Sequence, residues 1–280
     1  MNLNNVLTEI EKVDPEVYNK LDTRRRALRS FAGVGKRLSL AALPLAFGTF
    51  FKKAYGQPAG STVLEIFNYA LTLEYLESEF YKEGVSKFGA IGVPAAAQGG
   101  ITTIRNHEVA HVAFLRSAIT AAGGTPVSFT AANFDFTARG TFPTVFSDYA
   151  TFLAVAQTFE DTGVRAYKGR AAELVRGGDL LTAALNIHSV EARHAAHIRQ
   201  LRRNSGQAPT AKPWIRQNNS EIGSAAVQAS YNGEENTTQA TIQITGINGQ
   251  SIVTADAASE SFDEGLTKPQ VLAIVGPFIR

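Results

Sequence analysis

The stretch Glu108-Val-Ala-His-Val-Ala-Phe-Leu-Arg116 decides the fold of this chain, because a similar stretch, Glu191-Ala-Arg-His-Ala-Ala-His-Ile-Arg199, follows later in the sequence. Each contains the pattern Glu-x-x-His. Residues three apart lie on one face of an α-helix, so each copy can present a carboxylate and an imidazole to the same point. One such pattern is weak evidence for a metal site, whereas two copies predict a helical bundle with ligands in its core.

The duplication also includes the segment before each copy. Ala70-Leu-Thr-Leu-Glu74 matches Ala156-Gln-Thr-Phe-Glu160. The chain therefore contains two related helix pairs, each with half of a candidate site. Glu77 competes with Glu74 for the same role, but the repeat places Gly163 opposite Glu77, which favours Glu74. The six candidate ligands are Glu74, Glu108, His111, Glu160, Glu191 and His194.

Two tyrosines accompany the glutamates of the repeat. Tyr81 follows Glu74 by seven residues, and Tyr167 follows Glu160 by the same interval. Seven residues correspond to two helical turns, so both tyrosines should face the core near the ligands. There they can hydrogen-bond a ligand carboxylate, and tyrosine can lend an electron during oxidation. We therefore assign Tyr81 and Tyr167 as candidate catalytic residues.

The apolar periodicity predicts four helices, at about residues 60–88, 94–122, 146–175 and 179–205. Short links join the first helix to the second and the third to the fourth. The link between the second and third helices is much longer and rich in Gly, Thr and Phe. Such a long crossover favours a bundle in which one connection runs the length of the helices, rather than an up-down-up-down bundle. The predicted fold is thus mainly α.

Composition excludes several kinds of site. The chain has no cysteine, so disulfides, zinc–thiolate sites and iron–sulfur clusters are excluded, and any metal must bind His, Asp or Glu. Residues 57–280 contain 17 Lys/Arg against 20 Asp/Glu. This slightly acidic balance argues against nucleic acid as a partner, because nucleic-acid binding needs a basic face.

Burial of the candidate glutamates is the main argument for a metal. Carboxylates are rarely buried unless they are paired or bound to a metal, and four of them in one core would repel one another without cations. Arg105, Arg165 and Arg193 are available as counter-ions, but their positions in the pattern are peripheral. For His107, His188 and His197 we expect surface positions or contacts with the ligands.

Residues 1–56 form a basic leader. An arginine cluster at residues 24–26 precedes an apolar stretch at residues 38–51, which is too short to span a membrane and suits a signal peptide. Ala54 and Gly56 fit the small-residue positions of a cleavage site before Gln57. The pattern predicts a twin-arginine-type export signal and a periplasmic or cell-envelope location. The alternative is an uncleaved basic amphipathic helix, with a cytoplasmic location if the leader is not a signal.

The chain divides into the leader, a bundle at residues 57–205 and an extension at residues 206–280. In the extension, the Asn248-Gly249 dipeptide lies between two alternating stretches and predicts a β-hairpin. Thr267 and Pro269 predict the start of a short helix whose apolar residues pack inward. The extension has no catalytic pattern, so we expect it to serve packing or contacts in a homo-oligomer.

Three stretches of the bundle resemble the ferritin-like domain family of desiccation-related bacterial proteins. They are Phe67-Asn-Tyr-Ala-Leu-Thr-Leu-Glu-Tyr-Leu-Glu-Ser-Glu-Phe-Tyr81, Asn106-His-Glu-Val-Ala-His-Val-Ala-Phe-Leu-Arg116 and Val190-Glu-Ala-Arg-His194. The resemblance covers most of residues 60–205. It implies a ferritin-like four-helix bundle in which the six candidate ligands bind two Fe or two Mn ions, and a role in oxidative or desiccation stress.

Two functions remain open. The first is an oxidoreductase of the ferroxidase, peroxidase or catalase type, in which the dimetal centre reacts with dioxygen or hydrogen peroxide. In this hypothesis Glu108 and Glu191 bridge the ions, whereas Glu74 and Glu160 are terminal ligands. The second is a non-catalytic structural or assembly-forming envelope protein whose metal only stabilises the bundle. Metal storage in a ferritin-type cage is disfavoured, because the sequence lacks the acidic runs of a nucleation surface.

Overall fold

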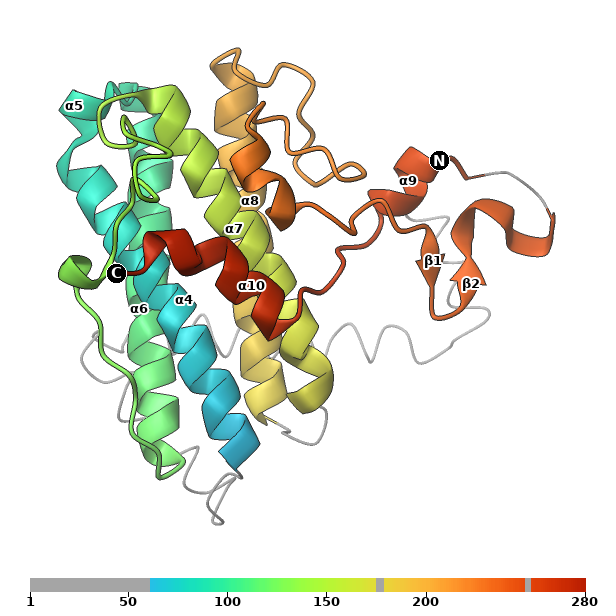
Figure 1. The fold of residues 1–280 in the computed structure, drawn as a ribbon, viewed down its shortest axis with the longest axis horizontal. Helices are drawn as coiled ribbons and strands as arrows, with labels where there is room; N and C mark the ends of the chain where they lie inside the picture. The colour runs from blue at the N-terminus through green and yellow to red at the C-terminus, as the bar shows by residue number, and fades with distance from the viewer. Residues whose placement is uncertain (1–60, 175–178, 250–252) are drawn as a thin grey trace, which may run out of the picture. The chain divides into compact units, whose positions relative to one another are not determined.

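Four long helices form the bundle (Figure 1) in the computed structural model, which describes residues 61–174, 179–249 and 253–280. Helix α4 packs against α6, and α7 packs against α8. The prediction of a mainly α four-helix bundle is confirmed, and each helix lies close to its predicted range. The bounds are Ser61–Ser86 for α4, Ala95–Ala121 for α6, Tyr149–Ala171 for α7 and Asp179–Asn204 for α8.

Local signals explain where the helices begin. The side chain of Asp148 caps α7 by accepting a hydrogen bond from the Thr151 backbone N–H at 2.7 Å. Pro94 occupies the cap position of α6, after a short helix α5 (Phe88–Ile91). Gly92 ends α5 with φ +76°, a left-handed conformation that glycine adopts without strain. The α4–α6 link is therefore short, and these two helices run antiparallel (Figure 1).

The connection between α6 and α7 is the predicted long crossover. It contains one short 3-10 helix (Ala131–Asn133) and runs along the length of the bundle, from the end of α6 to the start of α7 (Figure 1). Phe134 and Phe136 in this segment are buried, and Phe136 packs edge-on against Phe80 of α4. The crossover therefore supplies part of the apolar core as well as the connection.

The C-terminal extension contains short elements only: 3-10 helices Ala225–Ser230, Ile244–Gly249 and Gly276–Phe278, strands β1 (Thr238–Gln239) and β2 (Ile242–Gln243), and helices α9 (Ala255–Ser259) and α10 (Lys268–Val275). The predicted short helix is α10. Its first turn contains Pro269, and the Thr267 N–H donates to Gln270 Oε1 at 2.8 Å, as in a capping box.

The hairpin is present, but its predicted position is wrong. Strands β1 and β2 pair antiparallel, and Ala240 and Thr241 form the turn between them with φ +49° and +70°. Two residues with positive φ suit a two-residue hairpin turn, although neither is glycine. Asn248 and Gly249, the predicted turn, lie instead in a 3-10 helix. Residues 251 and 252 of the second predicted strand lie outside the described residues.

Helix α7 lies between the rest of the bundle and the extension. Every residue from Val155 to Tyr167 is buried. The buried guanidinium of Arg165 forms an ion pair with Glu234 at 2.7 Å and donates to three backbone carbonyls of the extension. Because the extension covers the outer side of α7, polar residues of this helix are buried on that side as well as in the bundle core.

The predicted export signal lies outside the described residues, which begin at residue 61. Within the part of the chain that is described, no helix combines the length and apolar character needed to cross a bilayer.

Candidate metal centre

The structure brings all six predicted ligands together in the middle of the bundle. The four carboxylate side chains are fully buried, and His111 and His194 are 9% and 4% exposed. Glu74 comes from α4, and its counterpart Glu160 comes from α7. The Glu-x-x-His pairs come from α6 and α8. The duplicated halves therefore contribute equally to one site, as the repeat predicts.

The six residues form two overlapping groups, and in each group one atom of every residue lies within 4.8 Å of the others. Glu108 and Glu191 belong to both groups. Two carboxylates that are shared in this way can each bridge a pair of ions. The first group contains Glu74, Glu108, His111 and Glu191, and the second contains Glu108, Glu160, Glu191 and His194.

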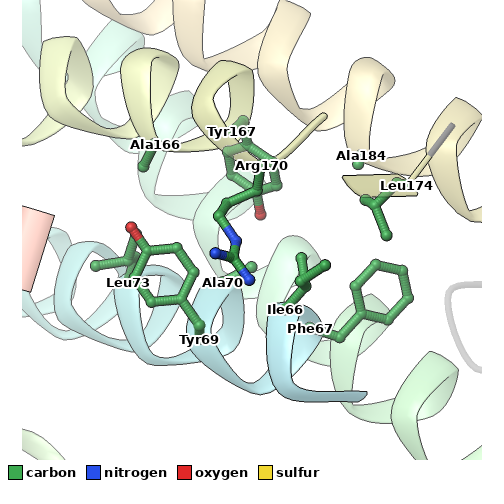
Figure 2. A pocket seen from close by; sticks show the side chains of 10 residues that line it. All are labelled: Ile66, Phe67, Tyr69, Ala70, Leu73, Ala166, Tyr167, Arg170, Leu174 and Ala184. Carbon is green, nitrogen blue, oxygen red and sulfur yellow. The ribbon is translucent and has the colours of Figure 1, made fainter. Parts of the chain in front are cut away.

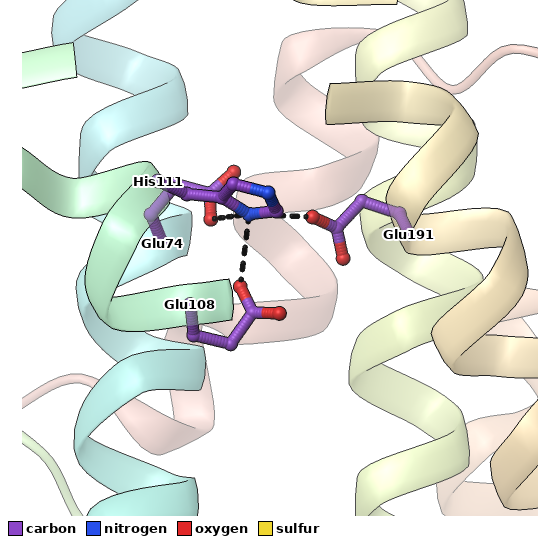
Figure 3. A group of neighbouring side chains, drawn as sticks. All are labelled: Glu74, Glu108, His111 and Glu191. Atoms are coloured by element: carbon purple, nitrogen blue, oxygen red, sulfur yellow. Dashed lines mark hydrogen bonds and ion pairs between the residues drawn. The ribbon is translucent and has the colours of Figure 1, made fainter. Parts of the chain in front are cut away.

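His111 faces the first group through one ring nitrogen (Figure 3). Its Nδ1 lies 3.0 Å from Glu74 Oε2, 3.3 Å from Glu108 Oε2 and 3.0 Å from Glu191 Oε1. Three carboxylates from three helices thus point at one nitrogen. A single proton cannot form good hydrogen bonds to all three, whereas a metal ion near this point can bind several oxygens and a nitrogen together.

His194 occupies the same place in the second group. Its Nδ1 lies 2.8 Å from Glu108 Oε1 and 3.4 Å from Glu160 Oε2. Although these distances are short, none of the three atoms has a partner in hydrogen-bonding geometry, and neither has either oxygen of Glu191. Buried polar atoms that lie close together without bonding one another have the arrangement expected of ligands directed at a shared centre.

In the metal-free centre, burial and the closeness of the carboxylates to one another and to the histidines shift the pKa values of these residues. Burial raises the pKa of Glu74 to about 8, and burial likewise raises the pKa of Glu160 well above its usual value. Burial alone would lower the pKa of His194, but the neighbouring Glu160 and Glu108 raise it to about 12. For His111, burial alone would also lower the pKa, but Glu74, Glu108 and Glu191 together outweigh it and raise the pKa. Without cations, the imidazolium rings and shared protons are the only neutralising groups in this cluster of described residues.

The two predicted tyrosines form hydrogen bonds across the site. The Tyr81 hydroxyl of α4 donates to Glu160 Oε1 of α7 at 2.6 Å, and the Tyr167 hydroxyl of α7 donates to Glu74 Oε1 of α4. Each tyrosine therefore orients the glutamate of the opposite half. Both hydroxyls are buried, and burial raises their pKa values, so both tyrosines are neutral donors.

His107 lies beside the site, on the outer side of α6. Its ring is stacked on the ring of His194, and His107 Nδ1 lies 2.9 Å from His194 Nε2. His194 has Nδ1 toward the carboxylates, so its Nε2–H is available to donate to His107. The counterpart of His107 in the repeat is Val190, which cannot accept a hydrogen bond. Of the other histidines, His188 Nδ1 lies 3.0 Å from the Val164 carbonyl, and His197 is partly buried.

Glu77, the alternative to Glu74 in the first helix, is 3% exposed and lies near the same carboxylates. Burial raises its pKa well above the usual value, and Glu191 and Glu160 add to the effect. Periodicity did point to Glu77, because it lies one turn from Glu74 on the apolar face. Glu77 nevertheless lies outside both groups of converging ligand atoms, whereas Glu74 belongs to the first group.

A narrow apolar recess lies between α4 and α7, beside Tyr167 (Figure 2). Tyr167 lies in its wall, and the Tyr167 hydroxyl binds Glu74. The Arg170 guanidinium lies over the Tyr69 ring, 5.9 Å from its centroid. The recess is small, about 10 Å³, which limits it to small molecules. Its lining residues are Ile66, Phe67, Tyr69, Ala70, Leu73, Ala166, Tyr167, Arg170, Leu174 and Ala184.

Comparison with known proteins agrees with this geometry. The model of a family described as "Ferritin-like domain" matches residues 62–204, which include all four long helices apart from the first residue of α4. No curated protein matches the sequence.

Proposed function

Because the chain belongs to the ferritin-like domain family, we propose that its six buried ligands hold two iron or two manganese ions and that this centre reacts with dioxygen or hydrogen peroxide. The observation that carries the proposal is the sharing of Glu108 and Glu191 by both ligand groups. Two groups with two common carboxylates suit a pair of ions, whereas a single ion would need only one group.

The donor set fits such ions in charge and in type. Four carboxylates carry four negative charges and the neutral imidazoles carry none, so two divalent ions balance the site. Mixed oxygen and nitrogen donors suit iron and manganese, whereas calcium prefers oxygen alone and soft ions prefer thiolates. The buried ligand atoms without hydrogen-bond partners also support binding, because an ion would satisfy them.

When bound, a pair of such ions supplies the electrons for reduction of dioxygen or peroxide. The residues of the chain position the ligands. Tyr81 and Tyr167 fix the outer oxygens of Glu160 and Glu74, and His107 fixes the ring of His194. Such supporting contacts strengthen metal binding and hold each ligand in its binding orientation.

Burial of the ligands defines the size of the substrate. Every ligand is at most 9% exposed, and the apolar recess beside Tyr167 is narrow. Dioxygen and peroxide are small enough to enter such a site, and an apolar wall favours dioxygen in particular. We propose that the reaction limits oxidant damage under stress.

The experiment starts from the full-length protein after removal of metal. Fe(II) without oxygen, or Mn(II), is titrated into it, and the metal bound per chain is measured. We expect two ions in the wild type and a large loss in Glu108→Gln/Glu191→Gln. The matched control is Glu83→Gln, which removes a carboxylate of α4 that pairs with Lys87 at the surface.

Consumption of dioxygen and peroxide by the loaded protein is then measured. Turnover that disappears in Glu108→Gln/Glu191→Gln but persists in Glu83→Gln supports an oxidoreductase. Two bound ions without consumption of either oxidant would instead indicate a structural role for the metal. Absence of stoichiometric binding would overturn the proposal itself.

A further inference from the structure

A wide groove lies along the second half of α8, and none of the six candidate ligands lines it. Its volume is about 590 Å³, within the range of about 300–1,000 Å³ that is usual for small-molecule sites. The α8 residues that line it recur every three or four positions from Arg193 to Asn204, so they share one face of the helix. Residues 211–213 of the extension also line the groove.

The charged side chains that line the groove are all basic. They are Arg193, Arg203 and Lys212, and no Asp or Glu is among the described residues of the lining. This is a local excess, because residues 57–280 contain 17 Lys/Arg against 20 Asp/Glu. Lys212 pairs with Glu260 at 2.5 Å, but in the described part of the chain neither arginine has an ion pair. Two guanidinium groups are therefore available to an anion.

Contacts on both sides hold the groove in shape. On the α8 side, the His197 ring packs against α6, where a Cβ atom at Gly100 would lie 2.2 Å from His197 Nε2. The lack of a side chain at Gly100 thus leaves the room that this ring occupies. On the other side, the ion pair between Lys212 and Glu260 holds residues 211–213 beside the end of α9. A site that is formed before binding loses less entropy when the ligand enters.

The spacing of the two arginines indicates the shape of the ligand. Arg193 and Arg203 are ten residues apart on α8, so their Cα atoms lie roughly 15 Å apart along the helix. His197 and Gln200 line the groove between them and offer neutral hydrogen-bonding groups. An elongated molecule with anionic groups at separate positions suits this row better than a single inorganic phosphate does.

From the volume, charge and spacing of the groove we infer that it binds a small organic polyanion, a molecule with two or more phosphate or carboxylate groups. Arg193 and Arg203 bind the anionic groups, since a guanidinium can donate two parallel hydrogen bonds to either kind of group. His197 and Gln200 bind polar atoms between them. This site goes beyond the proposed function and does not require the metal ions. The alternative is a solvated basic surface that attracts anions without a specific site.

Calorimetric titration of the metal-free full-length protein at low ionic strength tests the inference. The probes are ADP, which carries phosphates, and citrate, which carries carboxylates. Adenosine is the uncharged control for ADP. Removal of metal ensures that neither probe can bind through ions of the centre. Higher salt should weaken binding of both probes, because it screens exposed charges.

Three variants separate a site from general attraction. Arg193→Gln/Arg203→Gln removes two positive charges from the groove. The matched control, Lys82→Gln/Lys87→Gln, removes two positive charges from the surface near the end of α4, where each lysine pairs with a glutamate. Gln200→Glu keeps both arginines and places a negative charge between them. All of these side chains lie at the surface, so the far-ultraviolet circular dichroism should not change.

We expect one molecule of ADP or citrate per chain, and the probe that binds shows whether phosphate or carboxylate is preferred. Affinity should fall roughly 10- to 100-fold in Arg193→Gln/Arg203→Gln, fall also in Gln200→Glu, and stay unchanged in the lysine control. Binding of neither probe would overturn the inference. So would an equal loss in the lysine control, or binding of adenosine as tight as that of ADP. None of these outcomes affects the proposed metal centre.

Discussion

Tyr81 on α4 donates a hydrogen bond to Glu160 on α7 at 2.6 Å, so it supports a candidate ligand of the other half of the repeat rather than its own. In the same way, the Tyr167 hydroxyl on α7 donates a hydrogen bond to Glu74 on α4. The two hydrogen bonds cross between the helices that begin the two halves. In neither helix pair, therefore, is the glutamate held by the tyrosine of its own pair. The orientation of both glutamates depends on association of the two pairs.

Replacement of Tyr81 by Phe tests this dependence. Without the hydroxyl, Glu160 loses the hydrogen bond to Oε1, and we expect metal affinity to fall by roughly 10- to 100-fold while the helices remain folded. Competition with a chelator measures the affinity. Tyr149→Phe is the control, since none of the described hydrogen bonds involves the Tyr149 hydroxyl. Equal affinities for Tyr81→Phe and the control would contradict the supporting role.

His107 is expected to hold the ring of His194. His107→Ala removes the group 2.9 Å from His194 Nε2 and should weaken metal binding, whereas His107→Gln should retain part of it because the amide oxygen can accept the Nε2–H. His188→Ala, which removes a histidine bonded to the Val164 carbonyl instead, serves as the comparison. Similar affinity in Ala and Gln variants of His107 would show that a hydrogen bond at this position is not needed.

Metal affinity should rise with pH. Burial lowers the pKa of His194, but Glu160, Glu108 and Glu191 together outweigh it and raise the pKa to about 12, so the imidazole of the metal-free centre is protonated at neutral pH. Binding through Nδ1 requires the neutral ring and therefore releases a proton, which strengthens apparent binding roughly tenfold per pH unit for each proton released. A pH indicator in weakly buffered solution measures this release. We expect at least one proton per ion in wild type, and pH-independent affinity would contradict this prediction.

Removal of Arg165 should destabilise the fold strongly. In Arg165→Met, Glu234 remains buried without its counter-ion, a change that typically costs about 3–5 kcal/mol. Burial raises the pKa of Glu234 to about 7, so protonation relieves part of the loss in acid, and the destabilisation should be larger above pH 7 than below it. Urea unfolding measures the effect. Lys82→Ala, which breaks a surface pair with Glu79, should cost less than about 1 kcal/mol.

Gly169 should tolerate no side chain. A Cβ atom there would lie 2.0 Å from the Leu266 carbonyl oxygen, and a Cβ atom at Gly265 would lie 2.8 Å from Gly169 Cα. We expect Gly169→Ala to cost about 1–3 kcal/mol and to expose the extension to limited proteolysis. Gly99→Ala in α6 meets no atom within 4 Å and should be neutral or stabilising, because alanine favours the helix. Resistance of Gly169→Ala to proteolysis would contradict the close contact.

The helices and the cluster of six candidate ligands could be predicted from the sequence because both signals are local and repeated. Periodicity places each glutamate and histidine on a helix face, and the duplication indicates which faces meet. The same reasoning preferred Glu74 to Glu77, and Glu77 lies outside both groups of converging ligand atoms. Burial of Glu77 beside Gly163 could not be predicted, because it depends on how α4 and α7 approach one another.

The extension was harder to predict, since its contacts join residues far apart in the chain. The Tyr231 hydroxyl of the extension donates to Asp161 of α7, which also forms a buried ion pair with Arg199 of α8 at 2.5 Å. Nothing in the neighbouring sequence marks these residues as buried. The position of the hairpin was predicted wrongly for a related reason. The Asn-Gly rule describes only a local preference for a turn. The observed turn at Ala240–Thr241 is instead supported by side-chain contacts, such as the hydrogen bond from Thr238 to Gln243.

The pairing of the crossover with residues 279 and 280 has a consequence for the speed of folding. Phe134 forms a β-bridge with Ile279, and the Arg280 N–H donates to the Asn133 carbonyl at 3.0 Å. The crossover therefore completes its packing only when a segment far along the chain has joined it. Helical bundles usually fold quickly through local contacts, but this one should reach its final state in a step limited by closure of a long loop.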